Sequence, residues 1–315
     1  MSRGRFEWKG SRQWKMLVPL LLAGTLKAAG RQSALSEGEA CVSGKPAFDR
    51  RGQEASAGIL LRVATFNVHG GGNIPLLAQS IEASPSLRAA DVLMIQEIEQ
   101  RLDLDGPKEL AGSLGLEFVY APARPIPHGT HGLAILSRHP IRDPEIFDLE
   151  RFDLGYHSRR RIALAATIET RGVPLRLYNV HLDTRLNLEQ RTRQLRPVLE
   201  QALAQPRAVV GGDLNTIRAI SPLLPFLPLP LPGLGQASAL DDLLRRMGFA
   251  TPFAEIGATG PLGMRLDGLF PYEAPVVGYG KEAGIEVSDH LPLWIDLELP
   301  LEDEAAPLAP VAAPH

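Results

Sequence analysis

Short hydrophobic runs, separated by glycine, proline and polar residues, recur along most of the chain. Apolar runs of strand length that end at turn-forming residues are typical of buried β-strands. We therefore expect strands at Leu60–Val68, Val92–Ile98, Gly132–Leu136, Ile162–Ile168, Leu175–Leu182, Ala208–Gly211, Leu266–Phe270 and Leu291–Leu299. Apolar residues at i, i+3, i+4 spacing, or a helix-favouring composition, predict helices at Ile74–Ala83, Pro107–Leu114, Asn187–Ala204 and Ala237–Met247.

The order of these elements predicts the fold class. Expected strands outnumber expected helices about two to one, and helices separate only some of the strands. A doubly wound sheet needs a helix between most successive strands. The pattern therefore favours an α/β fold in which two packed sheets carry helices on their outer faces. We also expect Asn187 to cap the third helix and Pro197 to kink it.

Both ends of the chain differ in composition from its middle. Residues 1–58 hold ten Lys/Arg against five Asp/Glu, and the apolar run Met16–Leu26 behind the basic start resembles a secretory signal. Lys27 interrupts that pattern, so a basic leader without a signal is the alternative. We expect an exported, periplasmic or membrane-associated protein, with a cytoplasmic one as the alternative. The expected organisation is a leader and linker at 1–58, one domain at 59–300 and a disordered tail at 301–315.

Composition and charge narrow the class of protein. The chain has 315 residues, 44% hydrophobic and 22% charged, which is typical of a soluble globular protein and excludes a coiled coil or a collagen. Cys41 is the only cysteine, which excludes an intrachain disulfide and disfavours a structural thiolate zinc site. No apolar run reaches the roughly 18 residues of a membrane span. Residues 59–300 hold 23 Lys/Arg against 28 Asp/Glu, which lowers the expectation of tight duplex binding.

Polar side chains stand at or near one end of six expected strands or apolar segments. They are Asn67 and His69, Gln96 and Glu97, Asn179, His181 and Asp183, Asp213 and Asn215, Asp267, and Asp289 and His290. A strand-end Asp or Asn more often caps a turn than takes part in catalysis, and Gly211-Gly212 can mark only a tight bend. The recurrence of the feature in one chain favours a common pocket of acids, amides and histidines.

Such a pocket has a definite chemistry. Oxygen ligands without cysteine select a hard cation such as Mg²⁺ or Mn²⁺, which leaves positions for water and phosphate oxygens. An imidazole paired with a carboxylate can take a proton from water near neutral pH. An asparagine and a second histidine can donate hydrogen bonds to the charge that develops on phosphate oxygens. Together these groups describe the hydrolysis of a phosphate ester.

At these positions the sequence resembles the endonuclease/exonuclease/phosphatase superfamily, the deoxyribonuclease-like metal-dependent phosphoesterases. The matching stretches cover about residues 60–299 in family order. They are Thr65-Phe66-Asn67-Val68, Gln96-Glu97, Gly132-Leu133-Ala134-Ile135-Leu136-Ser137-Arg138, Asn179-Val180-His181-Leu182, Gly212-Asp213-Leu214-Asn215, Arg265-Leu266-Asp267 and Ser288-Asp289-His290. The resemblance implies a four-layered α/β sandwich, with two mixed β-sheets packed face to face and helices outside.

The resemblance also implies roles for single residues. Glu97 would be the principal metal ligand, with Asn67 and Asp289 close by, for Mg²⁺ or Mn²⁺. His290, oriented by Asp267, would be the base that activates water. Asp213 and Asn215 would position the nucleophile and the phosphate, and His181 would stabilise or protonate on the other side. The assignment of the base stays open between His290 and Asp213.

Three functions are open at this point. The first is a phosphodiesterase or phosphatase of small-molecule or lipid substrates, supported by the acidic domain and by Pro222–Pro232. This segment contains only proline, leucine and Phe226 and could touch a membrane surface, or it could only pack on the sandwich. The second is a nuclease, for which Arg159-Arg160-Arg161 could grip backbone phosphates. The third is a non-catalytic binding protein, although no identifiable catalytic position has been lost. A monomer is expected.

Overall fold

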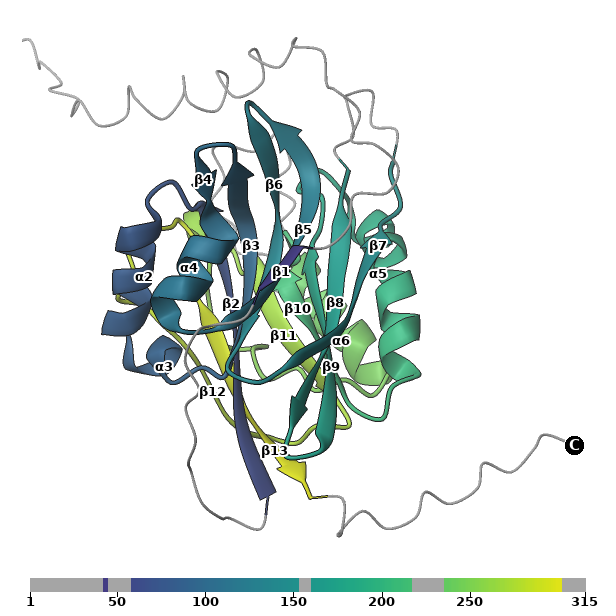
Figure 1. Ribbon diagram of the computed structural model, residues 1–315. Helices are drawn as coiled ribbons and strands as arrows, with labels where there is room; N and C mark the ends of the chain where they lie inside the picture. The colour runs from purple at the N-terminus through teal and green to yellow at the C-terminus, as the bar shows by residue number, and fades with distance from the viewer. Residues whose placement is uncertain (1–41, 45–57, 153–159, 217–234, 302–315) are drawn as a thin grey trace, which may run out of the picture. The chain divides into compact units, whose positions relative to one another are not determined.

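Two β-sheets pack face to face, with helices on their outer faces, in the computed structural model (Figure 1). The structure describes residues 42–44, 58–152, 160–216 and 235–301. Most of the expected leader and linker, most of the tail, Pro222–Pro232 and Arg159 lie outside these residues, so the expectations for them stay predictions. In the described part, no helix is long and apolar enough to cross a membrane.

The larger sheet has eight strands in the order β1-β5-β6-β3-β2-β13-β12, with β4 paired to β3. Only the β2–β3 pair is parallel, so the sheet is mixed. Its strands are β1 (Val42–Gly44), β2 (Gly58–Gly70), β3 (Val92–Arg101), β4 (Leu104–Asp105), β5 (Glu117–Ile126), β6 (Gly129–Ser137), β12 (Val276–Lys281) and β13 (Leu293–Pro300).

The smaller sheet has five strands in the order β11-β10-β9-β8-β7, and its only parallel pair is β9–β10. Its strands are β7 (Ile141–Asp148), β8 (Ile162–Thr170), β9 (Val173–His181), β10 (Ala208–Asp213) and β11 (Asp267–Tyr272). Both sheets are therefore mixed, and the expected four-layered sandwich is confirmed.

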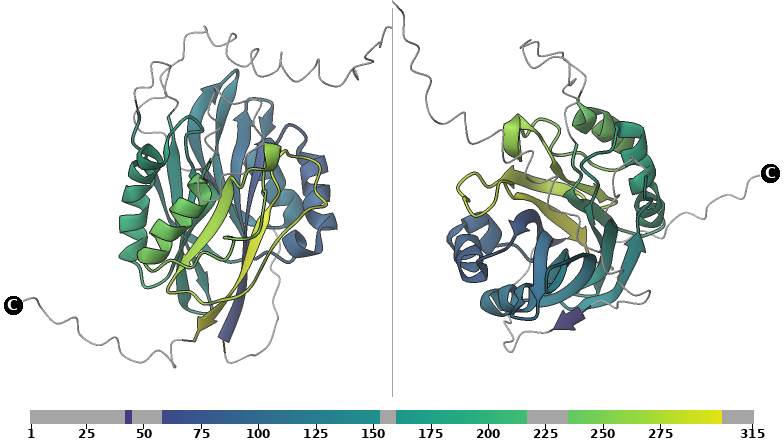
Figure 2. Two further views of the ribbon diagram at one scale, coloured as in Figure 1. Left: turned by 180° about the vertical axis from the view of Figure 1, so that it is seen from behind. Right: turned by 90° about the horizontal axis from the view of Figure 1, so that it is seen from above.

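Helices cover the two outer faces of the sandwich (Figure 2). The helices are α2 (Ile74–Ala83), α3 (Pro85–Arg88), α4 (Gly106–Leu114), α5 (Leu188–Leu203), α6 (Gln236–Arg246) and the 3-10 turn η2 (Pro261–Gly263). α2 and α4 bury apolar side chains such as Ile81 and Leu110 against the larger sheet, and α5 and α6 bury Leu195 and Leu244 against the smaller one. Each fully buried aliphatic side chain of this kind contributes roughly 1.5–3 kcal/mol.

A third apolar core lies between the sheets and fixes how they face each other. It joins Val63 and Ile135 of the larger sheet to Leu164 and Leu177 of the smaller one, all fully buried. β8 and β9 are apolar on both faces because helices cover their opposite face, whereas β13 alternates apolar residues with partly exposed polar ones. Double burial explains why such strands appear in the sequence as continuous hydrophobic runs.

Every expected strand and helix is present, and three longer strands escaped the sequence pattern. β5 contains Pro122 and Pro125, and a shift in its pairing with β6 lies between Pro122 and Arg124. β7 and β12 are edge strands with partly exposed faces, and they contain Pro144 or two glycines. Proline and glycine are tolerated at edges and bulges, which is where apolar periodicity fails.

The prediction for the start of α5 is confirmed. Asn187 caps the helix: its side chain accepts from the Gln190 backbone N–H at 2.9 Å, and the Gln190 side chain accepts from the Asn187 N–H at 3.1 Å. This reciprocal pair satisfies two backbone donors at the helix start. The helix continues through Pro197 to Leu203, and the expected kink stays a prediction.

Candidate active site

The expected polar residues gather where strands of both sheets meet. Asn67 and Glu97 lie toward the carboxyl ends of the parallel strands β2 and β3. In the smaller sheet, His181 ends β9, Asp213 ends β10 and Asp267 begins β11. These three are direct cross-strand neighbours, because Asp213 pairs in register with both His181 and Asp267.

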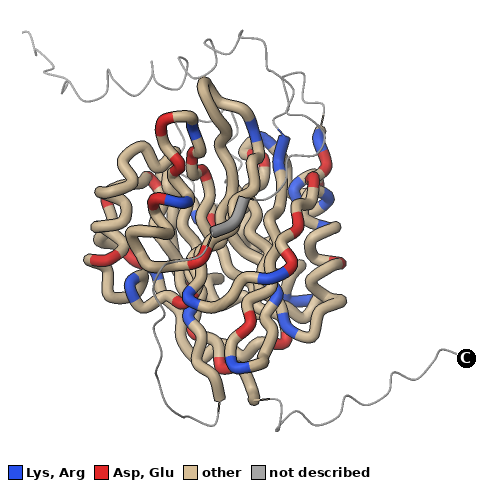
Figure 3. The backbone as a smooth tube through the Cα atoms, viewed as in Figure 1, with Lys and Arg blue, Asp and Glu red and all other residues tan. Residues whose placement is uncertain are grey.

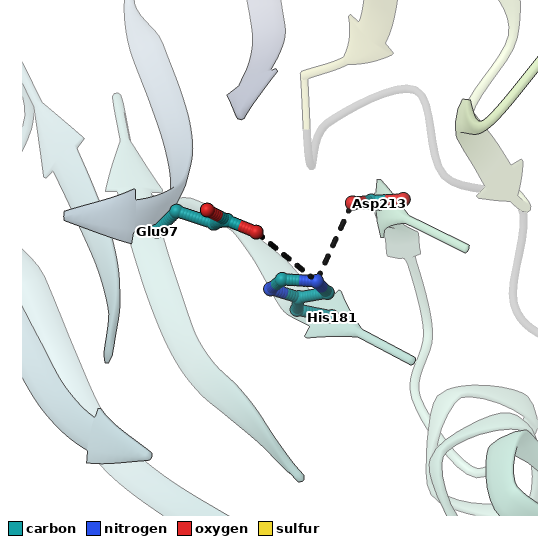
Figure 4. A group of neighbouring side chains, drawn as sticks. All are labelled: Glu97, His181 and Asp213. Atoms are coloured by element: carbon teal, nitrogen blue, oxygen red, sulfur yellow. Dashed lines mark ion pairs between the residues drawn. The ribbon is translucent and has the colours of Figure 1, made fainter. Parts of the chain in front are cut away.

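Glu97, His181 and Asp213 form the centre of this group (Figure 4). His181 Nε2 lies between the two carboxylates, 3.7 Å from Glu97 Oε1 and 3.4 Å from Asp213 Oδ2. Each residue offers one ligand atom, and these atoms all lie within 4.8 Å of one another. Two carboxylates and one imidazole fit a divalent cation that prefers hard ligands.

A β-bulge places Glu97 in the site. The residue has φ of 63°, and the pairing of β3 with both neighbouring strands shifts at this point. An extra residue in a strand turns its side chain away from the regular alternation. A non-glycine residue in the left-handed region is strained, and such strain is concentrated at functional sites.

Asn67 links the two sheets at the site. It is 1% exposed, and its Nδ2 donates to Asp213 Oδ2 at 2.8 Å. Its Oδ1 accepts from the His69 backbone N–H at 3.0 Å, which assigns the orientation of the amide. Its backbone oxygen accepts from Ser288 Oγ at 2.7 Å, two residues before His290. Asn67 therefore orients the Asp213 carboxylate and ties down the loop that carries His290.

The turn after β10 holds Asp213 and Asn215. Asp213 Oδ1 accepts from the Asn215 N–H at 2.9 Å, and Asn215 Nδ2 donates to the Leu182 oxygen at 2.9 Å. Asn215 has φ of 50°. Gly212 has φ of 133°, and a Cβ there would lie 2.1 Å from the Val180 oxygen, so this position requires glycine.

His290 and Asp267 form a second, buried pair next to Asp213. His290 Nδ1 donates to the Asp267 carboxylate, at 2.9 Å from Oδ2 and 3.1 Å from Oδ1. Its Nε2 faces Asp213 Oδ2 at 3.9 Å. Thr259, which is fully buried, donates to Asp267 Oδ2 at 2.7 Å. The expected contact between His290 and Asp267 is present, and the pair opens toward Asp213.

Asp289 is the one predicted site residue that lies apart in this structure. Its side chain is 44% exposed and pairs with His69 Nδ1 at 3.1 Å. Among the contacts of the described residues, none joins it to Glu97 or Asn67. The other predicted site residues come together, and Asp289 lies on the exposed rim.

The environment of Glu97 keeps its carboxylate charged. Burial opposes the charge, but the hydrogen bond from His131, at 3.5 Å, and the charges of His181 and His131 outweigh it and hold the pKa of Glu97 well below its usual range. Burial, together with the charge of Arg161, lowers the pKa of His181 well below its ordinary value. His181 is therefore a neutral imidazole at pH 7 beside an ionised glutamate.

The environments of Asp213 and His290 act in the opposite direction. Burial and the charge of Asp267 raise the pKa of Asp213 to about 7. Burial opposes the charge of His290, but its hydrogen bond with Asp267 and the nearby acids outweigh this and raise its pKa to about 9. Because the two groups face each other, they titrate as a pair.

The structure shows two site residues that the sequence did not indicate, and it shows that two of the expected polar residues do not line the site. His131 on β6 reaches Glu97, although the expected strand began one residue later, and Thr259 lies in a loop without a sequence signal. Gln96 Nε2 donates to Asn179 Oδ1 at 2.7 Å, and Asn179 donates to two backbone oxygens of the larger sheet. These two amides are fully buried and join the sheets instead of lining the site.

Comparisons with known proteins identify a family and similar folds. A profile described as "Endonuclease/Exonuclease/phosphatase family" matches residues 64–290. The fold is similar to an endonuclease/exonuclease/phosphatase from Beutenbergia cavernae (TM-score 0.60, 22% identity, 76% of this chain and 72% of that chain). It is also similar to the human Nocturnin catalytic domain (TM-score 0.56, 17% identity, 76% and 93%). A mannosyl-6-phosphatase from Bacteroides thetaiotaomicron has a similar fold (TM-score 0.55, 16% identity, 75% and 99%). No curated protein sequence matches this chain.

Proposed function

This chain belongs to the endonuclease/exonuclease/phosphatase family of metal-dependent phosphoesterases, and from that membership we propose that it is a Mg²⁺- or Mn²⁺-dependent phosphodiesterase or phosphatase of a small-molecule or lipid substrate. The observation that carries this proposal is the convergence of Glu97, His181 and Asp213 beside the buried Asp267–His290 pair. The group contains a charged metal ligand, a neutral hydrogen-bond donor and a proton acceptor within one small volume.

In this proposal Glu97 holds the cation, with Asn67 close by, and Asp289 on the exposed rim is the further ligand that the family resemblance implies. When bound, the cation draws charge from the phosphate oxygens and helps to orient the substrate. The low pKa of Glu97 fits this role, since the ligand is already ionised and need not lose a proton. His131 fixes the carboxylate through its second oxygen.

Water activation is assigned to the Asp213–His290 pair. The two groups face each other at 3.9 Å, with raised pKa values of about 7 and about 9. Near neutral pH the pair carries only one proton in a fraction of the molecules. In that state the pair can accept a second proton from an attacking water. Asp267 holds the imidazole in place through Nδ1 and leaves Nε2 free to face the reacting groups.

His181 and Asn215 are assigned to the phosphate. A neutral His181 can donate a hydrogen bond from its imidazole to a phosphate oxygen or to the leaving group. Asn215, strained at φ of 50°, is held beside Asp213 by its own backbone N–H. Preorganised donors of this kind act on charge that develops in the transition state.

The distribution of charge supports a small substrate over a long nucleic acid. Figure 3 shows Lys/Arg and Asp/Glu positions interspersed along the backbone in that view, and residues 59–300 hold 23 Lys/Arg against 28 Asp/Glu. A nuclease needs positive charge that follows several phosphates. Export, and contact with a membrane surface through Pro222–Pro232, are further proposals that rest on the sequence alone.

A substrate panel tests the proposal. The protein is assayed on bis(p-nitrophenyl) phosphate, sphingomyelin, a phosphoinositide and plasmid DNA, with Mg²⁺ and with EDTA. We expect Mg²⁺-dependent release from at least one small or lipid phosphoester, and no such release by Glu97→Gln. Faster Mg²⁺-dependent cleavage of plasmid DNA would replace the proposal with a nuclease, and inactivity on the whole panel would count against an enzyme.

A further inference from the structure

A fully buried arginine lies behind the candidate active site. Arg191 belongs to α5, on the outer face of the smaller sheet, and its side chain is 0% exposed (Figure 2). Burial lowers the pKa of Arg191 to about 10, against the charges of Asp213 and Asp183, so the guanidinium is charged at neutral pH. Taking a charge out of water is costly unless hydrogen bonds and opposite charge compensate it. The contacts that stabilise this charge therefore indicate what the side chain does.

The guanidinium of Arg191 donates to backbone oxygens on both sides of a gap between two loops. Its Nη1 donates to the Leu214 oxygen in the turn after β10 and, at 3.1 Å, to the Asp183 oxygen in the loop after β9. Its Nη2 donates to the Leu186 oxygen at 3.0 Å, in the same loop after β9. Its Nε donates to Gln236 Oε1 of α6 at 3.1 Å. One planar group therefore joins the two loops and both helices of this face.

These two loops carry the reacting groups of the smaller sheet. His181 ends β9 directly before the first loop, and Leu214 lies between Asp213 and Asn215 in the turn. The loops are also bonded to each other, because the Leu182 N–H donates to the Asp213 backbone oxygen and Asn215 Nδ2 donates to the Leu182 oxygen, both at 2.9 Å. Arg191 adds the connection that anchors both loops to α5.

We propose that Arg191 is a positioning residue, which aligns the phosphate-binding and water-activating groups of the smaller sheet through the backbone of their loops. The inference rests on the proposed function. A guanidinium suits this task because its donors form a rigid planar fork that reaches several carbonyl oxygens at fixed angles. Glu97, the proposed metal ligand, is on the larger sheet, so loss of Arg191 should lower turnover and leave metal binding unchanged.

Hydrogen exchange of the full chain tests the positioning without relying on catalysis. The variants are Arg191→Met, which removes the donors, and Arg191→Lys, which keeps the charge and reaches fewer oxygens. The matched control is Arg176→Met. Arg176 is 9% exposed, donates to the Asp143 oxygen at 2.7 Å and pairs with Glu145 at 2.9 Å, at the opposite end of β9 from the site.

The expected result is a local change in exchange. Peptides 180–186 and 211–216 should exchange at least ~10-fold faster in Arg191→Met than in the wild type, because the loops can open without breaking these hydrogen bonds. Peptides 173–178 and 268–272, in β9 and β11, should change little. Arg191→Lys should show a smaller change in the same two loop peptides, and the control should show no selective change there.

Kinetics separate positioning from a general loss of structure. With bis(p-nitrophenyl) phosphate, Arg191→Met should lower kcat at least ~10-fold, because misplaced groups act on the transition state. The Kd for Mg²⁺, measured by calorimetry, should change by less than ~3-fold. Arg176→Met should keep both values.

Three results would overturn the inference: exchange that accelerates equally in the loops and the core strands, an unchanged kcat of folded Arg191→Met, or a loss of Mg²⁺ affinity parallel to that of kcat. An equal loss of kcat in Arg176→Met would do so too. If Arg191→Met does not fold, Arg191→Lys is judged by the same criteria. A wild type that hydrolyses no phosphoester would remove the proposed function, and the exchange pattern would still decide whether Arg191 holds the loops.

Discussion

The two sides of the candidate site shift the pKa of a buried histidine in opposite directions. His181 and His290 are both less than a tenth exposed, and both approach Asp213. His181 Nε2 lies 3.4 Å from Asp213 and 3.7 Å from Glu97, farther than the 2.9 Å between His290 and Asp267, and burial with Arg161 lowers its pKa. His290 has a bonded partner in Asp267, and its pKa rises to about 9. One imidazole is neutral at pH 7 and the other is charged.

This difference divides the chemistry between the two sides. Titratable groups whose environments push their pKa values apart mark the acid and base roles in an active site. The Glu97–His181 side provides a fixed anion and a neutral donor, which suits the metal and the phosphate. The Asp213–His290 side stores a proton that can be exchanged, which suits water activation. Four predictions test this division.

The largest effect should follow loss of charge on the metal side. Glu97→Gln keeps the size of the side chain and removes the ionised ligand, so activity should fall at least ~10³-fold, because a catalytic metal contributes several kcal/mol. The wild type in EDTA should show the same loss. The control is Glu99→Gln, two residues along β3, where the glutamate pairs with Arg101 and lies outside the candidate metal group. Full activity of dialysed protein in EDTA would contradict the assignment.

The raised pKa values of His290 and Asp213 should make the free energy of unfolding depend on pH. The folded pKa of His290, about 9, lies above its ordinary value of 6.5. The contribution of His290 to the free energy of unfolding is therefore complete below pH 6.5 and is lost as the pH rises through 9. The expected loss is about 3 kcal/mol of the free energy of unfolding in EDTA. The pKa of Asp213 is raised from 3.8 to about 7, so its contribution to the free energy of unfolding also decreases as the pH rises, over the window from pH 3.8 to 7.

Denaturant unfolding between pH 6 and 10 measures this loss. His290→Gln should remove the slope between pH 6.5 and 9, whereas His128→Gln, at an exposed position, should keep it. A wild-type protein whose stability is constant across that window would show that the folded pKa of His290 is not raised.

The same side should act as a unit in catalysis. His290→Ala should lower turnover at least ~10²-fold, the range for loss of a general acid or base, and Asp267→Asn should cost a comparable factor. Because Asp267 acts through His290, the double variant should be little worse than either single variant. Losses that multiply would mean that the two residues act independently. The pH–rate profile then decides between Asp213 and His290 as the group that accepts the proton.

Much of this fold is readable from the sequence because double burial gives continuous apolar runs. Val92–Ile95 and Ile162–Ala166 are covered on both faces, so nothing polar interrupts their hydrophobicity. β7, at the edge of the smaller sheet, is exposed at Arg142 and Glu145 and contains a proline. Its register comes from pairing with β8, which is a tertiary interaction that the local sequence does not encode.

The candidate site was partly readable for a related reason. Glu97, Asp213 and His290 stand at or near the ends of apolar segments, so polar residues stand out at these positions. Gln96 stands out equally, yet its side chain turns into the sheet interface, because the bulge at Glu97 changes which side chain faces the site. His131 and Thr259 reach the site only through folding, across strand pairing and a long loop.

The smallest expected effect concerns Thr259, which we predict to be a positioning residue for Asp267. Its hydroxyl accepts from the backbone N–H groups of Leu266 and Asp267, at 2.9 and 3.1 Å, so its own proton is directed to Asp267 Oδ2. Its backbone oxygen accepts from the Leu291 N–H, next to His290. Thr259→Val leaves two buried N–H groups without this acceptor and removes one of the two hydrogen bonds that Asp267 Oδ2 accepts, so turnover should fall roughly 10-fold, equivalent to one strong hydrogen bond. Thr259→Ser keeps the hydroxyl and should restore most of the rate.

A purely structural role would lower the melting temperature of Thr259→Val and leave the pH–rate profile of the folded protein unchanged. A positioning role should instead shift the limb of that profile that reports His290, because Asp267 would hold the imidazole less firmly.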